Sequence, residues 1–225
     1  MRKLVLSLGL IAFVAAASVQ ATEYGFDKAH THIGFTVKHI LSKVPGEFKD
    51  YDGTFTFDPK KPEASKIDVT IQTASISTGV DMRDHHLQSP DFFDAAKYPT
   101  LTFTSTKVEK GDGDNKYKVT GDLTIHGVTK SVVLDVDYQG ADEMPMGKDG
   151  KTTAKIVGFS ATTTIDRRDY GLVWNKTLAS GNLMVGNDVT INLDIAGMDK
   201  KSLEAMKKMM EKMKQQPKPA DKPAN

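Results

Sequence analysis

The stretch Val189-Thr190-Ile191-Asn192-Leu193-Asp194-Ile195 alternates between apolar and polar residues, and this pattern decides the fold. Side chains on a β-strand point to opposite faces of the sheet with a period of two, so the stretch has one buried and one solvated face. Ile67-Asp68-Val69-Thr70-Ile71-Gln72 shows the same pattern, and similar runs recur from about Thr22 to Met198. A chain built of such runs predicts an antiparallel sheet that curls or stacks to hide its apolar side.

Turn residues divide the alternating region. Pro45-Gly46, Asp149-Gly150 and the segment 111–115 hold the residues that favour turns. We therefore predict an all-β protein with a short edge strand at 22–27 and eight main strands at roughly 30–40, 46–58, 66–74, 98–109, 116–126, 130–139, 151–166 and 187–197. If eight strands close into a barrel, the interior is just wide enough to hold one small ligand.

Two segments interrupt the alternation. Residues 78–99 lack it and contain Asp81-Met82-Arg83-Asp84-His85-His86-Leu87, which predicts one or two helical turns that cross the barrel mouth. Residues 167–186 form a long loop with three glycines and the only tryptophan, Trp174. Long ordered loops are often functional, but a surface connection packed by its own aromatic residues has the same composition. Both interpretations of this loop stay open.

The first 21 residues have the composition of a secretory signal peptide. A basic start at Arg2-Lys3 precedes an apolar segment from Leu4 to Ala17, and Val19-Gln20-Ala21 has the small residues of a cleavage site. The apolar segment is short for a bilayer span, and no charged stop-transfer flank follows it. We expect residues 1–21 to be removed on export, leaving one domain at 22–198 and a tail at 199–225.

Composition argues against several classes of function. The chain has no cysteine, which excludes disulfides, thiol catalysis and thiolate metal sites. Residues 22–198 hold 20 basic and 25 acidic side chains, and this mildly acidic balance argues against nucleic-acid binding. Nucleophile-elbow, zinc-protease and phosphate-loop motifs are absent from the sequence. We therefore expect a protein that is not an enzyme and needs no cofactor.

Histidines supply one alternative, a metal-binding protein. His30 and His32 flank Thr31 on a predicted strand, where a period of two places both imidazoles on one face. His85 and His86 could add ligands, but adjacent residues point in different directions. Histidines near strand starts also commonly bond to the backbone. The histidine pattern therefore favours the interpretation without a metal site.

The tail differs from the domain in composition. It holds eight lysines and four acidic residues, and three- and four-residue spacings relate Leu203, Met206, Met209, Met210 and Met213. This spacing predicts a short amphipathic helix, followed by a disordered end. Docking on its own domain, contact with an anionic membrane surface, and contact with a partner such as a membrane redox system all stay open for this helix.

Several strings resemble one known family through their order and number. Among them are His30-Thr31-His32-Ile33-Gly34-Phe35, Arg83-Asp84-His85-His86-Leu87-Gln88-Ser89-Pro90-Asp91-Phe92-Phe93, Gly121-Asp122-Leu123-Thr124-Ile125-His126-Gly127 and Asp166-Arg167-Arg168-Asp169-Tyr170-Gly171. From about Thr22 to Gly197 the chain resembles the YceI-like family of periplasmic, lipocalin-like proteins. The resemblance implies an eight-stranded antiparallel barrel that holds a long apolar ligand, typically an isoprenoid or fatty amide. It also implies a bacterial source, and with the expected signal peptide it predicts a periplasmic location.

The resulting hypothesis is a binding module that carries or stores a polyisoprenoid or another long-chain amphiphile by burial alone. The predicted pocket wall combines the apolar phase of the strands with two further aromatic residues: Ile33, Phe35, Val37, Phe55, Phe57, Val69, Ile71, Phe92, Leu101, Phe103, Leu123, Ile125, Phe159, Ile165 and Trp174. Arg83 and Arg167 are predicted to bind an anionic head group, with surface salt bridges as the alternative. A homodimer stays open.

Overall fold

The computed structural model describes residues 21–146 and 152–215. Residues 1–20, which hold most of the predicted signal peptide, and the end of the tail lie outside the described residues. The strands are β1 (Thr22–Phe26), β2 (His32–His39), β3 (Ser42–Phe48), β4 (Tyr51–Phe57), β5 (Lys66–Gln72), β6 (Ile76–Ser77), β7 (Thr100–Lys110), β8 (Lys116–Ile125), β9 (Val128–Met146), β10 (Thr152–Asp166) and β11 (Val185–Asp199). The α-helices are α1 (Asp81–Gln88) and α2 (Lys200–Gln215), and short 3-10 helices are η1 (Pro62–Ala64), η2 (Thr73–Ser75) and η3 (Arg167–Tyr170).

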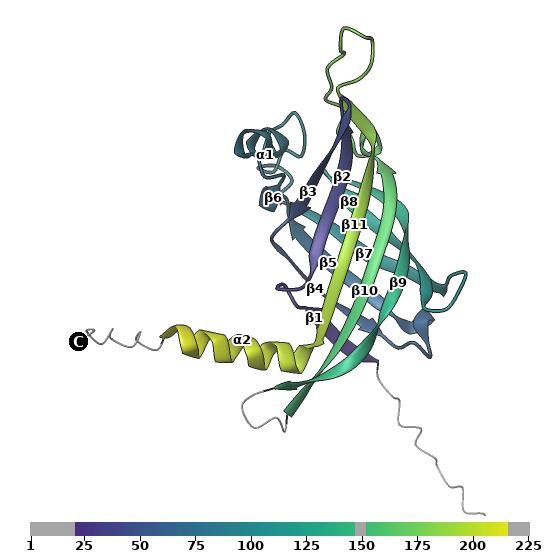
Figure 1. Cartoon of the computed structure of the whole chain (residues 1–225), viewed down its shortest axis with the longest axis vertical. Coiled ribbons are helices and arrows are strands. Elements are labelled where there is room, and N and C mark those ends of the chain that lie inside the picture. Colours follow the sequence, from purple (N-terminus) through teal and green to yellow (C-terminus); the bar gives the residue numbers. More distant parts are fainter. Residues whose placement is uncertain (1–20, 147–151, 216–225) are drawn as a thin grey trace, which may run out of the picture.

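The strands curl into a closed antiparallel barrel (Figure 1). Closure occurs at β11, whose last residues pair with β1 while β1 pairs on its other side with β4. The earlier part of β11 pairs with β2, which continues through β3 to β6. Within the described residues, β1 with β2, β3 with β4 and β5 with β6 act as three interrupted strands, giving eight positions around the barrel. The predicted eight-stranded barrel is thus confirmed.

A side chain replaces the backbone ladder where β1 gives way to β2. Asp27 Oδ1 accepts a hydrogen bond from the backbone amide of Ala29 at 3.1 Å, where the chain turns out of the sheet. Thr31 then uses its hydroxyl in place of a backbone pair, because Oγ1 donates to Ala196 O at 3.1 Å and accepts from Ala196 N at 3.0 Å. The barrel therefore stays closed across the break.

Three strand predictions differ from the structure. The segment 22–27 is not an edge strand, because β1 has a partner on both sides. The predicted strand 46–58 is divided into β3 and β4 at Lys49 and Asp50, which hydrogen-bond to Ser75 and to Gln72 at the end of β5. The turn expected at Pro45-Gly46 is wrong, because both residues pair with β2 inside β3 and the chain turns earlier, between His39 and Ser42. The predicted strand 130–139 is the central part of β9, which runs on to Met146 beside β10.

Alternation along each strand places the core inside the barrel. On β8, the side chains of Tyr117, Val119, Leu123 and Ile125 are buried, and the polar residues between them are more exposed. Aromatic rings from distant strands meet in the interior, including Phe55, which packs on Phe159 with ring centroids 5.8 Å apart. The solvated outer face and apolar inner face are those that the period-two pattern predicts.

The two helices lie at opposite ends of the barrel (Figure 1). The end that carries α1 and residues 171–184 is called the apical end here. At the other end, α2 leaves β11 and covers an outward apolar patch, where Leu203 packs on Ala154 and Met198. The predicted amphipathic helix of the tail is present, and its first turns dock on their own domain. Among the described residues, no helix is both long enough and apolar enough to span a bilayer.

Candidate functional site

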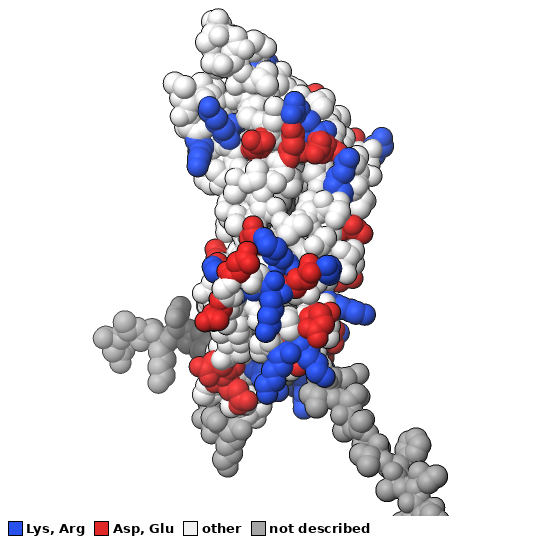
Figure 2. All heavy atoms as spheres, turned by 90° about the vertical axis from the view of Figure 1, so that its right-hand side faces the viewer, with Lys and Arg blue, Asp and Glu red and all other residues white. Residues whose placement is uncertain are grey.

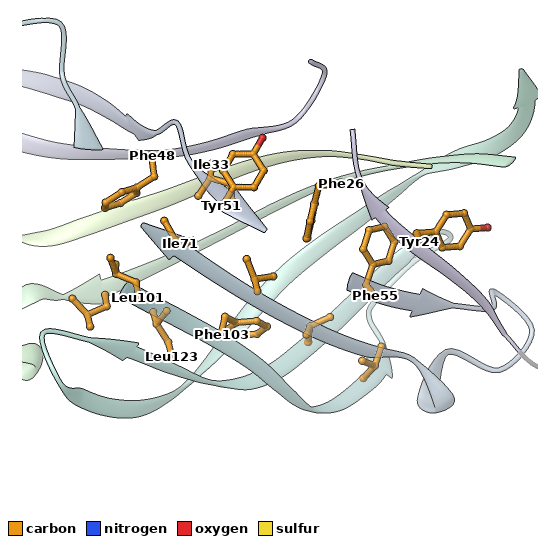
Figure 3. Packing of buried hydrophobic residues seen from close by; sticks show 14 of the residues in the cluster. Tyr24, Phe26, Ile33, Phe48, Tyr51, Phe55, Ile71, Leu101, Phe103 and Leu123 are labelled. Carbon is orange, nitrogen blue, oxygen red and sulfur yellow. The ribbon is translucent and has the colours of Figure 1, made fainter. Parts of the chain in front are cut away.

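A cavity of about 270 Å³ lies inside the barrel. Its wall is almost wholly apolar, with residues contributed by the strands all round the barrel and by the segment after α1. Figure 3 shows Phe48 and Ile33 on one side of the interior and Leu101, Phe103 and Leu123 on another, with their side chains directed inward. Polar groups in this wall are few, among them those of Ser65, Arg167 and Tyr170, so most of the void cannot hold water and favours an apolar occupant.

Glycines leave room for the aromatic rings that form this wall. A Cβ atom at Gly46 would overlap the ring of Phe35, which pairs with Gly46 across β2 and β3. A Cβ atom at Gly197 would overlap the ring of Phe55 in the same way. Phe35 can therefore lie against the backbone of the neighbouring β3, and Phe55 against the backbone of β11, which is separated from β4 by β1.

Fourteen of the fifteen residues predicted for the pocket wall do line this cavity, although their contact with a ligand stays a prediction. They are Ile33, Phe35, Val37, Phe55, Phe57, Val69, Ile71, Phe92, Leu101, Phe103, Leu123, Ile125, Phe159 and Ile165. The exception is Trp174, which does not form part of the wall. Its ring packs against His86 and Phe92, with centroid distances of 5.0 and 5.1 Å, and so lies behind Phe92.

The sequence prediction missed other parts of the wall. On β9 and β11 the alternation itself could have identified Val132, Leu134, Val136, Val189, Ile191, Leu193 and Ile195. Leu87, Phe93, Tyr170 and Leu172 also line the cavity, but they lie in segments without strand periodicity. For these four residues the local sequence carries no signal that separates the cavity from the surface.

Arg167 is the one charged side chain in the described cavity wall. It is only 4% exposed, and burial lowers the pKa of its guanidinium. Nε donates to Gly186 O at 2.9 Å, Nη1 to Leu172 O, and Nη2 to Val185 O at 3.5 Å. A guanidinium has five N–H groups, so two remain without an acceptor among the described residues.

Tyr170 places a second polar group beside Arg167 in η3. The side chain lines the cavity and is 2% exposed, and burial raises the pKa of its hydroxyl to about 12. No described residue hydrogen-bonds to this hydroxyl. A buried hydroxyl without a partner is costly and calls for an explanation. The η3 end of the cavity therefore has unused hydrogen-bonding capacity.

The other arginines at this end make local contacts. Arg83, predicted to bind a head group, does not line the cavity, because its Nε donates to Thr78 Oγ1 at 2.6 Å and its Nη2 to Thr78 O at 2.9 Å. Arg168 forms a salt bridge with Asp166 at the surface, and its Nε donates to Asp166 Oδ1 at 3.0 Å. That hydrogen bond holds the pKa of the Asp166 carboxyl at about 2.

Three of the four histidines considered for a metal site each lie beside a single carboxylate. His30 Nδ1 lies 2.7 Å from Asp27 Oδ2, and His32 Nδ1 lies 3.2 Å from Glu47 Oε2. His86 Nε2 lies 3.0 Å from Asp91 Oδ2. In residues 21–146 and 152–215, no three His, Asp or Glu side chains converge as metal ligands.

Comparison with known proteins places this barrel among relatives. Residues 24–197 match the YceI-like domain. Protein YceI of Escherichia coli is 40% identical over 205 residues, which cover 89% of this chain and 100% of that protein. The YCEI protein of Campylobacter jejuni has a solved structure that is 41% identical, with a TM-score of 0.59, over 77% of this chain and 96% of that one.

A more distant structure shares the fold. A polyisoprenoid binding domain from Saccharophagus degradans superposes with a TM-score of 0.57 over 79% of this chain and 98% of that chain. At 18% identity, this likeness shows the fold alone. The family is shown by the domain match and the relatives at 40% identity or above: the chain belongs to the YceI-like family.

Proposed function

We propose that this protein is a periplasmic carrier or store for a long-chain amphiphile, with a polyisoprenoid as the leading class of ligand. The observation that carries the proposal is the apolar cavity inside the closed barrel, with a buried guanidinium and a buried free hydroxyl at one end. The Saccharophagus domain, which is named for polyisoprenoid binding, supports this choice of ligand. The expected signal peptide at residues 1–21 supports export.

The driving force would be burial of hydrocarbon. On β11 alone the wall runs from Val189 to Ile195, a path of roughly 20 Å at the rise of an extended strand. A chain lying along this path gains about 0.8 kcal/mol for each buried methylene, from which the costs of ordering and desolvation are subtracted. A long flexible hydrocarbon therefore fits the cavity better than a compact polar metabolite, and its binding requires no chemical step.

The polar end would hold the head group. Arg167 can donate two further hydrogen bonds, and the Tyr170 hydroxyl can donate or accept one. Together they suit a head that presents oxygen atoms, such as a carboxylate, phosphate, amide or quinone. The tail would extend away from η3 along the barrel.

A chain-length series tests the carrier. Prenyl alcohols of increasing length are titrated into delipidated protein by calorimetry. We expect affinity to rise with each unit until the cavity is full and then to level off, with a negative heat-capacity change. Binding that is independent of chain length, or no binding at all, would contradict the proposal.

Tyr170→Phe tests the head-group site with a change of one oxygen atom. Because the hydroxyl has no described partner, its loss should leave the free energy of unfolding unchanged or raise it. We expect weaker binding of an oxygen-headed chain and unchanged binding of a hydrocarbon of the same length. Equal effects on both ligands would remove Tyr170 from the site.

A further inference from the structure

The turn between β2 and β3 has residues that its geometry disfavours. His39 ends β2 and Ser42 begins β3, so Ile40 and Leu41 form a two-residue hairpin turn. Two-residue hairpin turns need positive φ at the first or at both central residues, and they therefore favour glycine, asparagine or aspartate at those positions. Ile40 has a φ of 54°, which is a genuine outlier for a β-branched residue. Strain of this kind clusters at functional positions.

The same turn exposes both apolar side chains. Leu41 is 96% exposed and Ile40 is 38% exposed, at the apical end of the barrel. The loop 173–184 lies beside them, since Ile40 N donates to Met184 O at 2.7 Å, and it adds exposed Val173 and Leu183. The turn 38–43 and the loop 173–184 are together called the apical patch.

The charge of the apical patch has one sign. Its two segments contain Lys38, Lys43 and Lys176 and no acidic residue. Figure 2 shows an apical tip largely free of charged side chains, above a band where charged groups gather. Exposed apolar side chains next to lysines match the surface of an anionic bilayer, where apolar groups enter the headgroup region and lysines meet phosphates.

The patch is continuous with the cavity. Leu172 lines the cavity and the next residue, Val173, is 66% exposed. Leu172 O also accepts the hydrogen bond from Arg167 Nη1, so the chain passes from the proposed head-group site to the patch within one residue. A ligand head at η3 would therefore lie next to whatever the patch contacts.

We propose that the apical patch docks this protein on an anionic phospholipid surface, with Ile40 and Leu41 inserted among the headgroups, for exchange of its lipid with the bilayer. The exchange role rests on the proposed carrier function. The other candidate surface is α2, whose Met209 and Met210 are half exposed. It leaves the opposite end of the barrel, its Leu203 is already buried against the domain, and none of its described side chains lines the cavity (Figure 1).

The test is cosedimentation with vesicles of phosphatidylglycerol and phosphatidylethanolamine. Ile40→Asn/Leu41→Gly removes both apolar side chains and replaces the strained Ile40 with a residue that tolerates positive φ, so the thermal midpoint should hold or rise while vesicle affinity falls by about tenfold or more. Lys38→Gln, Lys43→Gln and Lys176→Gln should each weaken binding by about fivefold in low salt. Val133 is an exposed apolar residue on the side of β9, so Val133→Asn is the matched control and should bind like wild type.

Several outcomes would overturn the docking proposal. Wild-type protein that does not bind the vesicles, or an Ile40→Asn/Leu41→Gly variant that binds as tightly as wild type, contradicts it. Loss of binding in Met209→Glu/Met210→Glu alone assigns the contact to α2. A change of oligomeric state in the turn variant, seen by light scattering, assigns the patch to a second copy of the chain.

The ligand content separates this proposal from the carrier function. Ile40 and Leu41 do not line the cavity, so the turn variant should retain bound lipid but exchange it more slowly between vesicles. Bound lipid without vesicle binding would overturn docking and leave the carrier standing. Vesicle binding with an empty cavity would overturn the carrier and leave docking as a surface property.

Discussion

Filling the cavity from one small residue should remove ligand binding without unfolding the barrel. Ala161 lines the cavity on β10, between Val136 on β9 and Leu193 on β11. Ala161→Phe adds six ring carbons, and displacing about as many ligand methylenes would remove about 5 kcal/mol, or more than three decades in Kd. The unliganded protein should stay within about 2 kcal/mol of wild type, because burial of the ring offsets the cost of tighter packing.

The neighbouring residue provides the control. Thr162 is exposed on the outer face of the same strand, so Thr162→Phe adds the same ring outside the barrel. Both variants are titrated with a long-chain prenyl alcohol by calorimetry, and both are unfolded with denaturant. Wild-type affinity in Ala161→Phe, or an equal loss in Thr162→Phe, would refute the assignment of the inner face.

Three further changes have defined outcomes. Phe103→Asp buries a charge in the wall, so lipid should no longer copurify and the free energy of unfolding should fall by about 3–5 kcal/mol, while Lys207→Ala on α2 should change neither. The Asp166 carboxyl should titrate at about 2 by carbon NMR because of its bond to Arg168, and Arg168→Gln should raise that pKa toward the ordinary value. Since the folded pKa is the lower one, the stabilising contribution is present above the ordinary pKa and is lost as the pH falls toward 2. Leu203→Asp should release α2 from Ala154 and Met198, seen as faster amide exchange in α2 with an unchanged barrel.

The barrel was predictable because period-two alternation is a local property. The inward residues of β8, such as Leu123 and Ile125, follow from it directly, and so does the inward face of β11. Closure by β1 was not predictable in this way. It depends on pairing Tyr24 with both Phe55 and Asp199, which lie far apart in the sequence.

The candidate site was predictable only where it lies on strands. Tyr170 and Leu172 line the cavity because η3 and the left-handed Gly171 turn the chain inward, a geometry that no periodic pattern reports. Arg167 and Arg168 are neighbours of the same type, yet one enters the cavity and the other pairs with Asp166. Trp174 was predicted to line the wall as the tryptophan of the long loop 167–186, whereas tertiary packing places its ring behind Phe92.

The central claim is that the barrel encloses a long hydrocarbon chain. Its most direct test is native mass spectrometry of protein purified without detergent and then exposed to a bacterial lipid extract, followed by solvent extraction of the complex. The account predicts a one-to-one adduct whose mass and extract identify a long-chain amphiphile, and a bare chain for Ala161→Phe. A bare chain for the wild-type protein, with no long-chain lipid in the extract, would contradict it.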